Sequence, residues 1–431
     1  MAFGRAVRAG RSLLGLLILL AVMAVMDRPR AGEPVRFLST QFAPVTEAER
    51  MRAILADFVG DVVFQPYDSL ALVERLTAEG EIPVGLLAGL HSDLAALAGA
   101  GLLRPVDAIA GQLSDRAIPT GVLDLARLGT DTMRYIPWIQ TTYLMVAHRR
   151  ALDYLPAGAR LDRLTYLDLI DWATAMHAAQ GEPRLGFPAG PRGLMHRFIH
   201  GYLYPSYTGG GITTLRSPAT LLMWRDMRAL WQHTNVRSLT YNSMAEPLLA
   251  GDVWVAWDHV ARLMPAISAA PDDFVVFPAP LGPRGRGVIV VTLGLAMPTD
   301  ASQAAAAEAL IEYLTRPSTG ARIATQLGFF PFDATAAGHI EDDAVAGMLE
   351  AIAAQNSAPE TLIGVLPPDL GGGSETFGLS YLLAFTRIVL RGIEIDETMT
   401  TVAAQMADLL QESGTPCWPP DPVGLGPCQV P

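Results

Sequence analysis

The sequence predicts an α/β protein of two lobes, each assembled from segments that lie far apart in the chain. Three observations point to this fold class. The chain has 431 residues, which is too long for one ordinary hydrophobic core. Strand-like and helical segments alternate over residues 34–103, as in βαβ units with a parallel sheet. A helix-rich stretch over residues 164–267 then interrupts this alternation before strands return.

The first segment predicts three short strands with a helix after each. Its apolar runs are rich in β-branched residues, and Glu47 and Glu49 fall in the first turn of the first helix. The predicted strands are residues 34–39, 61–64 and 82–87, and the predicted helices are residues 46–58, 70–78 and 92–99.

Residues 135–146 are the next feature, because they contain two apolar runs joined by the polar residues Gln140, Thr141 and Thr142. Aromatic and β-branched residues in runs of this length favour buried strands. Polar side chains between two such strands are typical of a crossing between lobes, where a ligand can be held. We expect two further crossings, near residues 278–288 and 329–332, and therefore a hinge with an interlobe cleft.

The remaining elements follow from the same patterns. We expect helices at residues 166–180, 194–204, 218–233, 244–249, 302–315, 317–327, 344–354, 375–391 and 397–412, and strands at 185–186, 253–257, 273–277 and 287–297. The predicted N-terminal lobe is then residues 33–140 plus 285–330, and the C-terminal lobe is residues 141–284 plus 331–414. A Pro/Gly-rich tail follows at residues 415–431.

Composition excludes several functions. Half of the residues are hydrophobic and 17% are charged, as in a globular protein. A formal net charge of -12 argues against nucleic acid as a partner. All 31 basic residues are Arg, so a lysine-dependent phosphate loop and Schiff-base chemistry are excluded.

The N-terminus, residues 1–32, predicts an export signal. Arg5, Arg8 and Arg11 precede an apolar stretch at residues 13–26, and cleavage could follow Ala24. An uncleaved anchor is the alternative. No Cys lies near this stretch, so we expect a periplasmic protein that is not a lipoprotein.

The two cysteines, Cys417 and Cys428, lie close together in the tail, where a disulfide is a reasonable pairing in an exported chain. Elsewhere His196 and His200 have a spacing that can hold a metal, but no third ligand is evident. We expect no metal and no cofactor. No nucleophile-elbow motif is present and no carboxylates can be paired, so catalysis is not expected.

Several strings resemble the family 1 extracellular solute-binding proteins, which are sugar receptors of ABC importers similar to maltose-binding protein. They are VRFL at residues 35–38, DLA at 93–95 with GLL at 101–103, YIPW at 135–138, YTGGG at 207–211, LAGDVWVAW at 249–257, GLAMP at 294–298, and the helix at 305–315 before Arg316 and Pro317. The strings occur in the family's order over nearly the whole predicted mature chain.

The resemblance implies a two-lobed periplasmic binding protein type II fold with a three-crossing hinge. It also implies a monomeric receptor that captures a carbohydrate or small polyol and delivers it to an ABC permease. An exported glycoside-processing enzyme and a transport-independent sensory binding module remain alternatives.

The resemblance further implies which residues line the cleft. They are Gln41, Tyr67, Trp138, Gln140, Thr141, Tyr143, Tyr207, Gly209, Gly210, Gly211, Trp257, Asp258, Thr292 and Phe330. The family often has an Asp after the third strand, where this chain offers His91 instead. The same sequence is compatible with core positions for Trp138 and Trp257, surface turns for Tyr67 and Tyr207, and a helix cap for Asp258.

Overall fold

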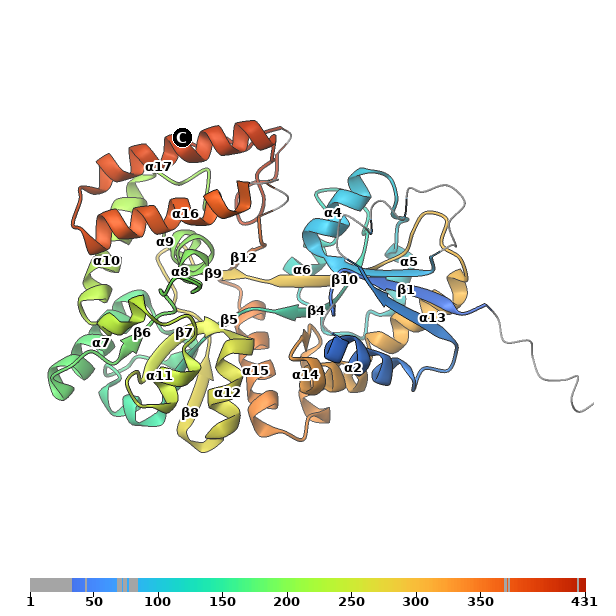
Figure 1. The fold of residues 1–431 in the computed structure, drawn as a ribbon, viewed down its shortest axis with the longest axis horizontal. Helices are drawn as coiled ribbons and strands as arrows, with labels where there is room; N and C mark the ends of the chain where they lie inside the picture. The colour runs from blue at the N-terminus through green and yellow to red at the C-terminus, as the bar shows by residue number, and fades with distance from the viewer. Residues whose placement is uncertain are drawn as a thin grey trace, which may run out of the picture.

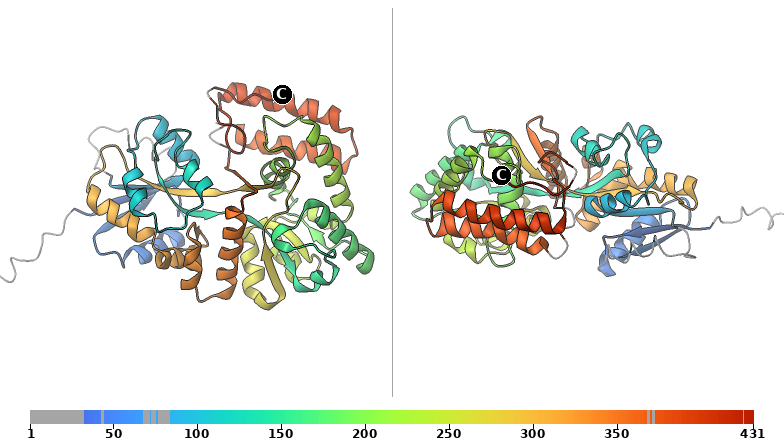
Figure 2. Two further views of the ribbon diagram at one scale, coloured as in Figure 1. Left: turned by 180° about the vertical axis from the view of Figure 1, so that it is seen from behind. Right: turned by 90° about the horizontal axis from the view of Figure 1, so that it is seen from above.

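The computed structural model describes residues 33–42, 45–67, 72, 76, 84–367, 370, 373–424 and 426–431. These residues form two α/β lobes that lie side by side (Figure 1) and are seen from behind and from above in Figure 2. The predicted export signal lies outside the described residues. Of the helix expected at residues 70–78, only Leu72 and Leu76 are described, and Arg75 between them is not.

A six-stranded sheet forms the centre of the N-terminal lobe, in the order β11-β4-β10-β3-β1-β2. Strand β1 pairs in parallel with β2 and β3, whereas β10 is antiparallel to β3 and β4. The strands are β1 (Val35–Ser39), β2 (Val62–Pro66), β3 (Leu86–Leu90), β4 (Ile136–Thr141), β10 (Val291–Ala296) and β11 (Phe330–Pro331). The helices of this lobe are α2 (Val45–Leu55), α4 (His91–Gly99), α5 (Asp107–Gln112), α6 (Thr120–Leu125), α13 (Ala304–Leu314) and α14 (Pro317–Leu327).

The C-terminal lobe contains a four-stranded sheet in the order β6-β7-β5-β8 and a two-stranded sheet of β12 and β9. The strands are β5 (Tyr143–His148), β6 (Leu185–Gly186), β7 (Val255–His259), β8 (Phe274–Phe277), β9 (Arg286–Ile289) and β12 (Thr361–Gly364). The α-helices are α7 (Tyr166–Gln180), α8 (Met195–Phe198), α9 (Tyr204–Thr208), α10 (Pro218–Gln232), α11 (Ala245–Leu249), α12 (Val260–Ala269), α15 (Asp343–Ser357), α16 (Ser374–Phe385) and α17 (Ile395–Ser413). Short 3-10 or π turns are η1 (Arg149–Tyr154), η2 (Leu161–Arg163), η3 (Ile199–Leu203), η4 (Val236–Leu239), η5 (Pro271–Asp273), η6 (Ala334–His339) and η8 (Thr386–Leu390).

Three crossings join the lobes, as the predicted fold class requires. Strand β4 continues into β5 through Thr142, β9 continues into β10 through Val290, and β11 leads into η6 and α15. The single strand expected at residues 287–297 is therefore two strands in two different sheets. Both halves are apolar and buried, so the sequence shows one run where the chain passes between lobes. Residues 286–289, expected in the N-terminal lobe, form β9, which pairs with β12 and packs against η3 of the C-terminal lobe.

The third strand is also displaced, because β3 covers Leu86–Leu90 instead of residues 82–87. His91 consequently follows this strand directly. The sequence did not predict α5, α6, α12 or β12; α12 has Pro265 in its interior, a residue that argues against a helix.

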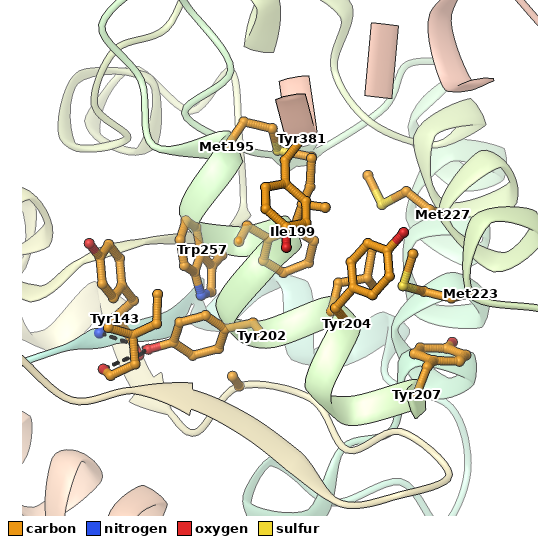
Figure 3. Packing of buried hydrophobic residues seen from close by; sticks show 14 of the residues in the cluster. Tyr143, Met195, Ile199, Tyr202, Tyr204, Tyr207, Met223, Met227, Trp257 and Tyr381 are labelled. Atoms are coloured by element: carbon orange, nitrogen blue, oxygen red, sulfur yellow. Dashed lines mark hydrogen bonds between the residues drawn. The ribbon is translucent and has the colours of Figure 1, made fainter. Parts of the chain in front are cut away.

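The core of the C-terminal lobe contains many aromatic residues. Figure 3 shows Tyr143, Tyr202 and Trp257 gathered near one another, with further tyrosines and methionines to the right of and above them. Tyr143 and Trp257 stack in parallel with 4.9 Å between ring centroids, and the Tyr202 ring meets Trp257 edge-on at 5.2 Å. These ring contacts hold the first residues of β5 in place, directly after the crossing.

Within the described part of the chain, no helix combines the length and the apolar character needed to cross a membrane.

Candidate functional site

The carboxyl ends of the parallel strands of both lobes meet at the crossings. In the N-terminal lobe, Leu90 at the end of β3 lies opposite Leu293 of β10. In the C-terminal lobe, β7 is parallel to β6 and ends at His259, which lies opposite Tyr143 at the start of β5. Ligands of open α/β sheets bind outside such strand ends. We call this region the junction.

On the N-terminal side, the junction begins with the segment after β1. The Thr40 hydroxyl donates to the Asp93 carboxylate at 2.8 Å, which fastens this segment to the start of α4. Gln41 is half-buried, and its amide donates to the Thr40 carbonyl oxygen at 2.9 Å. Tyr67 follows β2, is half-buried, and its backbone N–H donates to the Ser39 carbonyl at 2.7 Å.

His91 is the first residue of α4 and lies 2.9 Å from the Tyr135 hydroxyl through its Nδ1. Burial lowers the pKa of His91 to about 4, so the ring is neutral near pH 7. The same ring borders a small space between the lobes that Thr292 and Leu366 also line. The Thr292 hydroxyl is buried and has no hydrogen-bond partner among the described residues.

The two lobes touch through Thr141 and His259, whose Oγ1 and Nε2 atoms are 2.9 Å apart. The Nδ1 of His259 accepts from the Ala261 backbone N–H at 3.2 Å, so the proton of a neutral ring lies on Nε2 and is donated to Thr141. Burial and the Arg262 charge lower the pKa of His259 to about 4, which keeps it neutral. The hydroxyl proton of Thr141 is then available to another acceptor.

Two arginines give this side of the junction a positive charge. Arg197 and Arg262 are half-buried and are both close enough to the Tyr143 hydroxyl to oppose the rise in its pKa that burial causes. One guanidinium nitrogen of Arg262 donates to the backbone carbonyls of Asn242 and Arg192, which fixes the neighbouring loops.

Asp258 is the carboxylate of this cluster, and it is fully buried. It accepts from the backbone N–H groups of Met244 at 2.9 Å and His259 at 2.7 Å. Burial raises the pKa of Asp258 to about 7 against these hydrogen bonds. The residue therefore caps a loop and is sequestered from solvent, although the resemblance implied that it lines the cleft.

Trp138 is also placed differently from the expectation. Its side chain is 3% exposed, its indole N–H donates to the Leu314 carbonyl at 3.0 Å, and its ring packs near Phe37 and Phe42. The contact with Leu314 at the end of α13 shows that this face of β4 is covered by helix. The structure thus places Trp138 in the N-terminal lobe core.

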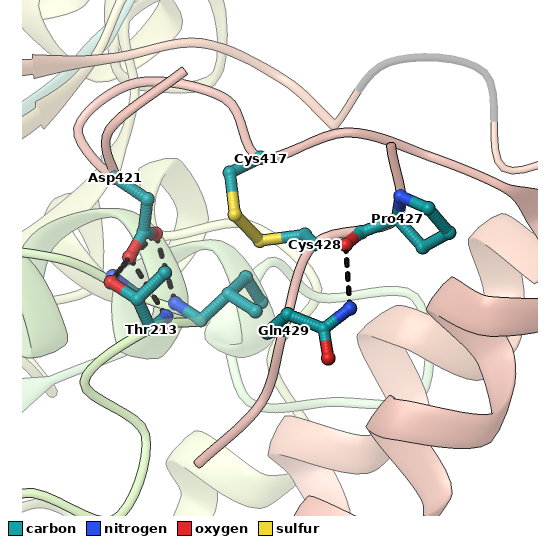
Figure 4. Close-up of a disulfide and its surroundings, with 8 residues drawn as sticks. Thr213, Cys417, Asp421, Pro427, Cys428 and Gln429 are labelled. Carbon is teal, nitrogen blue, oxygen red and sulfur yellow. Dashed lines mark hydrogen bonds between the residues drawn. A yellow bond between two sulfur atoms is a disulfide. The ribbon is translucent and has the colours of Figure 1, made fainter. Parts of the chain in front are cut away.

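The glycine loop after α9 binds an internal carboxylate. The backbone N–H groups of Gly211, Ile212 and Thr213 donate to Asp421 of the tail at 2.8 to 2.9 Å (Figure 4). A Cβ atom on Gly210 would lie 2.6 Å from the same carboxylate. Gly209, with φ +86°, ends α9 in the left-handed conformation. The loop is occupied by the protein's own tail and is not open to a solute.

Four more expected residues are buried in the lobes or the hinge. The Tyr207 hydroxyl donates to Asp226 at 2.7 Å within the C-terminal lobe. Gln140 donates to the Pro331 carbonyl and accepts from Asn356, so it links two crossings. Trp257 and Phe330 are fully buried. Of the expected set, Gln41, Tyr67, His91, Thr141, Tyr143 and Thr292 lie at the junction.

The residues that the sequence analysis missed are His259, Arg262 and Arg197, while His196 was considered only as a metal ligand. His259 and Arg262 could have been found, because they follow a predicted strand at its carboxyl end. Nothing in the local sequence distinguishes Arg197 from the other arginines.

Cys417 and Cys428 are joined by a disulfide with 4.5 Å between their Cα atoms (Figure 4). The tail that they close also borders a cavity of about 680 Å³ between the lobes, which α4, α6 and Ile363 of β12 line as well. The rings of His196 and His200 are 6.3 Å apart. Among the described residues, no three His, Cys, Asp or Glu side chains are grouped as metal ligands.

Solved structures that are similar to this one include bacterial solute receptors. The sugar-binding protein MalE from Xanthomonas citri has 17% identity and a TM-score of 0.67, over 88% of this chain and 98% of that one. UgpB from Mycobacterium tuberculosis, in complex with glycerophosphocholine, has 17% identity and a TM-score of 0.60, over 88% of this chain and 99% of that one. The bacterial receptor AcbH, with an exclusive preference for β-D-galactopyranose, has 14% identity and a TM-score of 0.67, over 86% and 95%.

At these identities the structural likeness shows the fold alone. A search of curated proteins found no match to this sequence. The model of the family described as bacterial extracellular solute-binding protein matches residues 61–321, which is more than half of the chain. Together with the two lobes and the three crossings, this match identifies the chain as a member of the bacterial extracellular solute-binding protein family.

Proposed function

We propose that this protein captures a small carbohydrate or polyol at the junction and delivers it to an ABC permease. The observation that supports this most directly is the convergence of β1, β3 and β7 on one polar region at the three crossings. Thr141, His91 and His259 supply neutral donors and acceptors there, which suit hydroxyl groups.

The proposed mechanism is closure of the lobes around the solute. Closure would bring the segments after β1 and β3 toward the loops around Asn242 and Arg262. A solute that contacts both walls binds the closed state more tightly than the open one, and this difference shifts the population toward closure. The permease would then engage the closed form.

The finer assignments are part of the same proposal. The family is extracellular, and we propose a periplasmic location, a monomeric state and an N-terminus without lipid attachment. The family and the solved relatives are binding proteins, so we favour a receptor over an exported glycoside-processing enzyme. A sensory module without transport would use the same closure and differs only in the protein that recognises it.

A thermal-shift screen of the purified protein against sugars, polyols, sugar phosphates and amino acids tests the proposal. A true ligand at about 100 times its Kd should raise the unfolding free energy by about 2.7 kcal/mol. Small-angle X-ray scattering should show a smaller radius of gyration with that ligand than with a non-binding isomer. If no small solute changes either quantity, the receptor proposal fails. Turnover of a bound glycoside would favour the enzyme instead.

A further inference from the structure

We propose that the solute of this receptor is amphipathic, with a neutral hydroxylated head at the junction and a hydrocarbon group in the cavity that the disulfide-closed tail borders. The inference rests on the proposed receptor function. It narrows the substrate class from free sugars and polyols to those that carry an attached hydrocarbon group.

The cavity has walls from both lobes. Its volume is about 680 Å³, which is within the range of sites for small molecules. Helices α4 and α6 and residues 128–134 form one wall, and Ile363 of β12 forms the other together with the tail. The walls approach at two places, since Cβ atoms on Gly121 and Gly129 would lie 3.0 Å from Ile363 and 3.8 Å from Val423. A solute in this cavity therefore contacts both lobes, as closure by a population shift requires.

The walls of the cavity are mostly apolar. Large apolar side chains line it from both lobes, namely Leu125, Leu128, Ile363, Trp418 and Val423. Against such walls the hydroxyl groups of a free sugar would lose water without gaining hydrogen-bond partners. A hydrocarbon group would instead be stabilised there by its removal from water. The lining thus favours an apolar substituent over a second sugar ring.

The two charged side chains at the cavity do not select an ion. Asp124 and Arg134 both line it, and their charges have opposite signs. Asp124 is exposed, and Arg134 donates to the Leu103 carbonyl at 3.3 Å. Because the two charges balance, the cavity suits a neutral solute.

His91 connects the cavity to the junction. One face of α4 lines the cavity through positions i, i+4, i+7 and i+8, which are His91, Ala95, Ala98 and Gly99. The three small residues leave room beside the helix, and the neutral His91 ring is the polar end of this face. His91 also borders the small space where the buried Thr292 hydroxyl has no partner among the described residues. A hydroxylated head beside His91 would place its substituent along α4.

The backbone at Leu128 supports the same assignment. Leu128 has φ +52°, a left-handed conformation that is uncommon and unfavourable for a bulky residue. In this conformation it contributes an apolar side chain to the wall of the cavity. Local strain of this kind is concentrated at ligand sites, where the surrounding structure maintains it.

Isothermal titration calorimetry with the purified protein tests the inference on matched series of neutral solutes. Each series has one head, which is glycerol, glucose or galactose. The head is free or carries a methyl, butyl or hexyl group, and every compound is used below its micelle concentration. Ala95→Phe fills part of the cavity. Ala96→Phe is the control, because Ala96 is the next residue of α4, is exposed and does not line the cavity.

We expect binding in the preferred series to tighten by about three- to fourfold for each added methylene. Ala95→Phe should weaken binding of the hexyl compound by about tenfold or more and spare the free head, while Ala96→Phe changes neither. Leu128→Gly is a second variant, since glycine suits the left-handed backbone and removes an apolar wall group. It should also weaken binding of the hexyl compound. Circular dichroism and the melting temperature show that each variant is folded.

Two results would overturn the inference and leave the receptor function standing. One is binding of a free sugar or polyol that a butyl or hexyl group does not strengthen. The other is an equal effect of Ala95→Phe and Ala96→Phe on binding of the hexyl compound. If no head binds in any form, the receptor proposal itself fails.

Discussion

Trp138 and Thr141 lie on the same strand, but Trp138 packs in the core of the N-terminal lobe and Thr141 lies at the contact between the lobes. Its ring lies among Phe37, Phe42 and the end of α13, and its indole N–H is satisfied by Leu314. Every polar and apolar part of the side chain is used inside the N-terminal lobe. Thr141, three residues later on the same strand, reaches the other lobe instead.

Trp138→Ala should therefore lower stability and spare the site. We expect the free energy of unfolding to fall by about 3–5 kcal/mol, from lost burial and the remaining cavity. The fraction that stays folded should bind solute with unchanged Kd. Urea denaturation and calorimetry measure the two quantities, and Trp138→Phe should show a smaller loss of stability. Weaker binding at unchanged stability would place Trp138 in the site after all.

At the scale of elements, η3 holds two of the crossings in register. The Tyr202 hydroxyl accepts from the Tyr143 backbone N–H at 3.2 Å and lies 3.4 Å from the Ile289 carbonyl (Figure 3). It is also 3.1 Å from the Thr142 hydroxyl. One side chain thus joins the β4–β5 crossing to the β9–β10 crossing. A hinge needs such a fixed point so that closure is a rotation between two defined states.

Removing that hydroxyl provides a test of the element's role. Tyr202→Phe leaves the buried N–H of Tyr143 without its acceptor, and we expect the unfolding free energy to fall by about 1–3 kcal/mol. Tyr381→Phe is the matched control, because the Tyr381 hydroxyl is buried with no partner among the described residues. Urea denaturation of both variants should show a clear loss only for Tyr202→Phe. Equal losses would mean that the hydroxyl does not support the crossings.

At the scale of the whole molecule, burial of neutral histidines couples stability to pH. Burial lowers the pKa values of His91, His196 and His259 to about 4 in the folded state, and it lowers the pKa of His200 well below its ordinary value. Between about pH 4 and 6.5 the unfolded chain therefore binds more protons at these rings, and stability rises with pH. Asp258, with a pKa raised to about 7, acts in the opposite direction between about pH 4 and 7. Four histidines outweigh one carboxyl group.

Acidification from pH 7 to pH 5 should consequently destabilise the protein. Urea denaturation at several pH values should show a net uptake on unfolding of about two protons near pH 6 and nearly three near pH 5. His259→Asn, which replaces a titrating ring by a neutral amide, should reduce that uptake by about one proton. A stability that stays constant or increases on acidification would contradict the neutral, buried state of these histidines.

The sequence alone determined the class of fold, most of the helices and the first and third crossings. These follow from hydrophobic periodicity and chain length, which act locally and leave a visible pattern. Because these patterns are local, they do not show where one apolar run is divided between two sheets. Residues 287–297 form one apolar run, and only pairing with β12 on one side and with β3 and β4 on the other divides it into β9 and β10.

The candidate site could be predicted only in part from the sequence. Thr141, Tyr143 and His91, which the family resemblance implied, lie beside the crossings in the structure, and their part in binding stays a prediction. The glycine loop at residues 209–211 and Trp138 were expected to line the cleft. In the structure, Asp421 of the tail occupies the glycine loop. The end of α13 covers Trp138. Arg197 carries no local signal at all. The surroundings of Arg197 are set by contacts between segments that are distant in the chain, and its neighbours in the sequence do not reveal them.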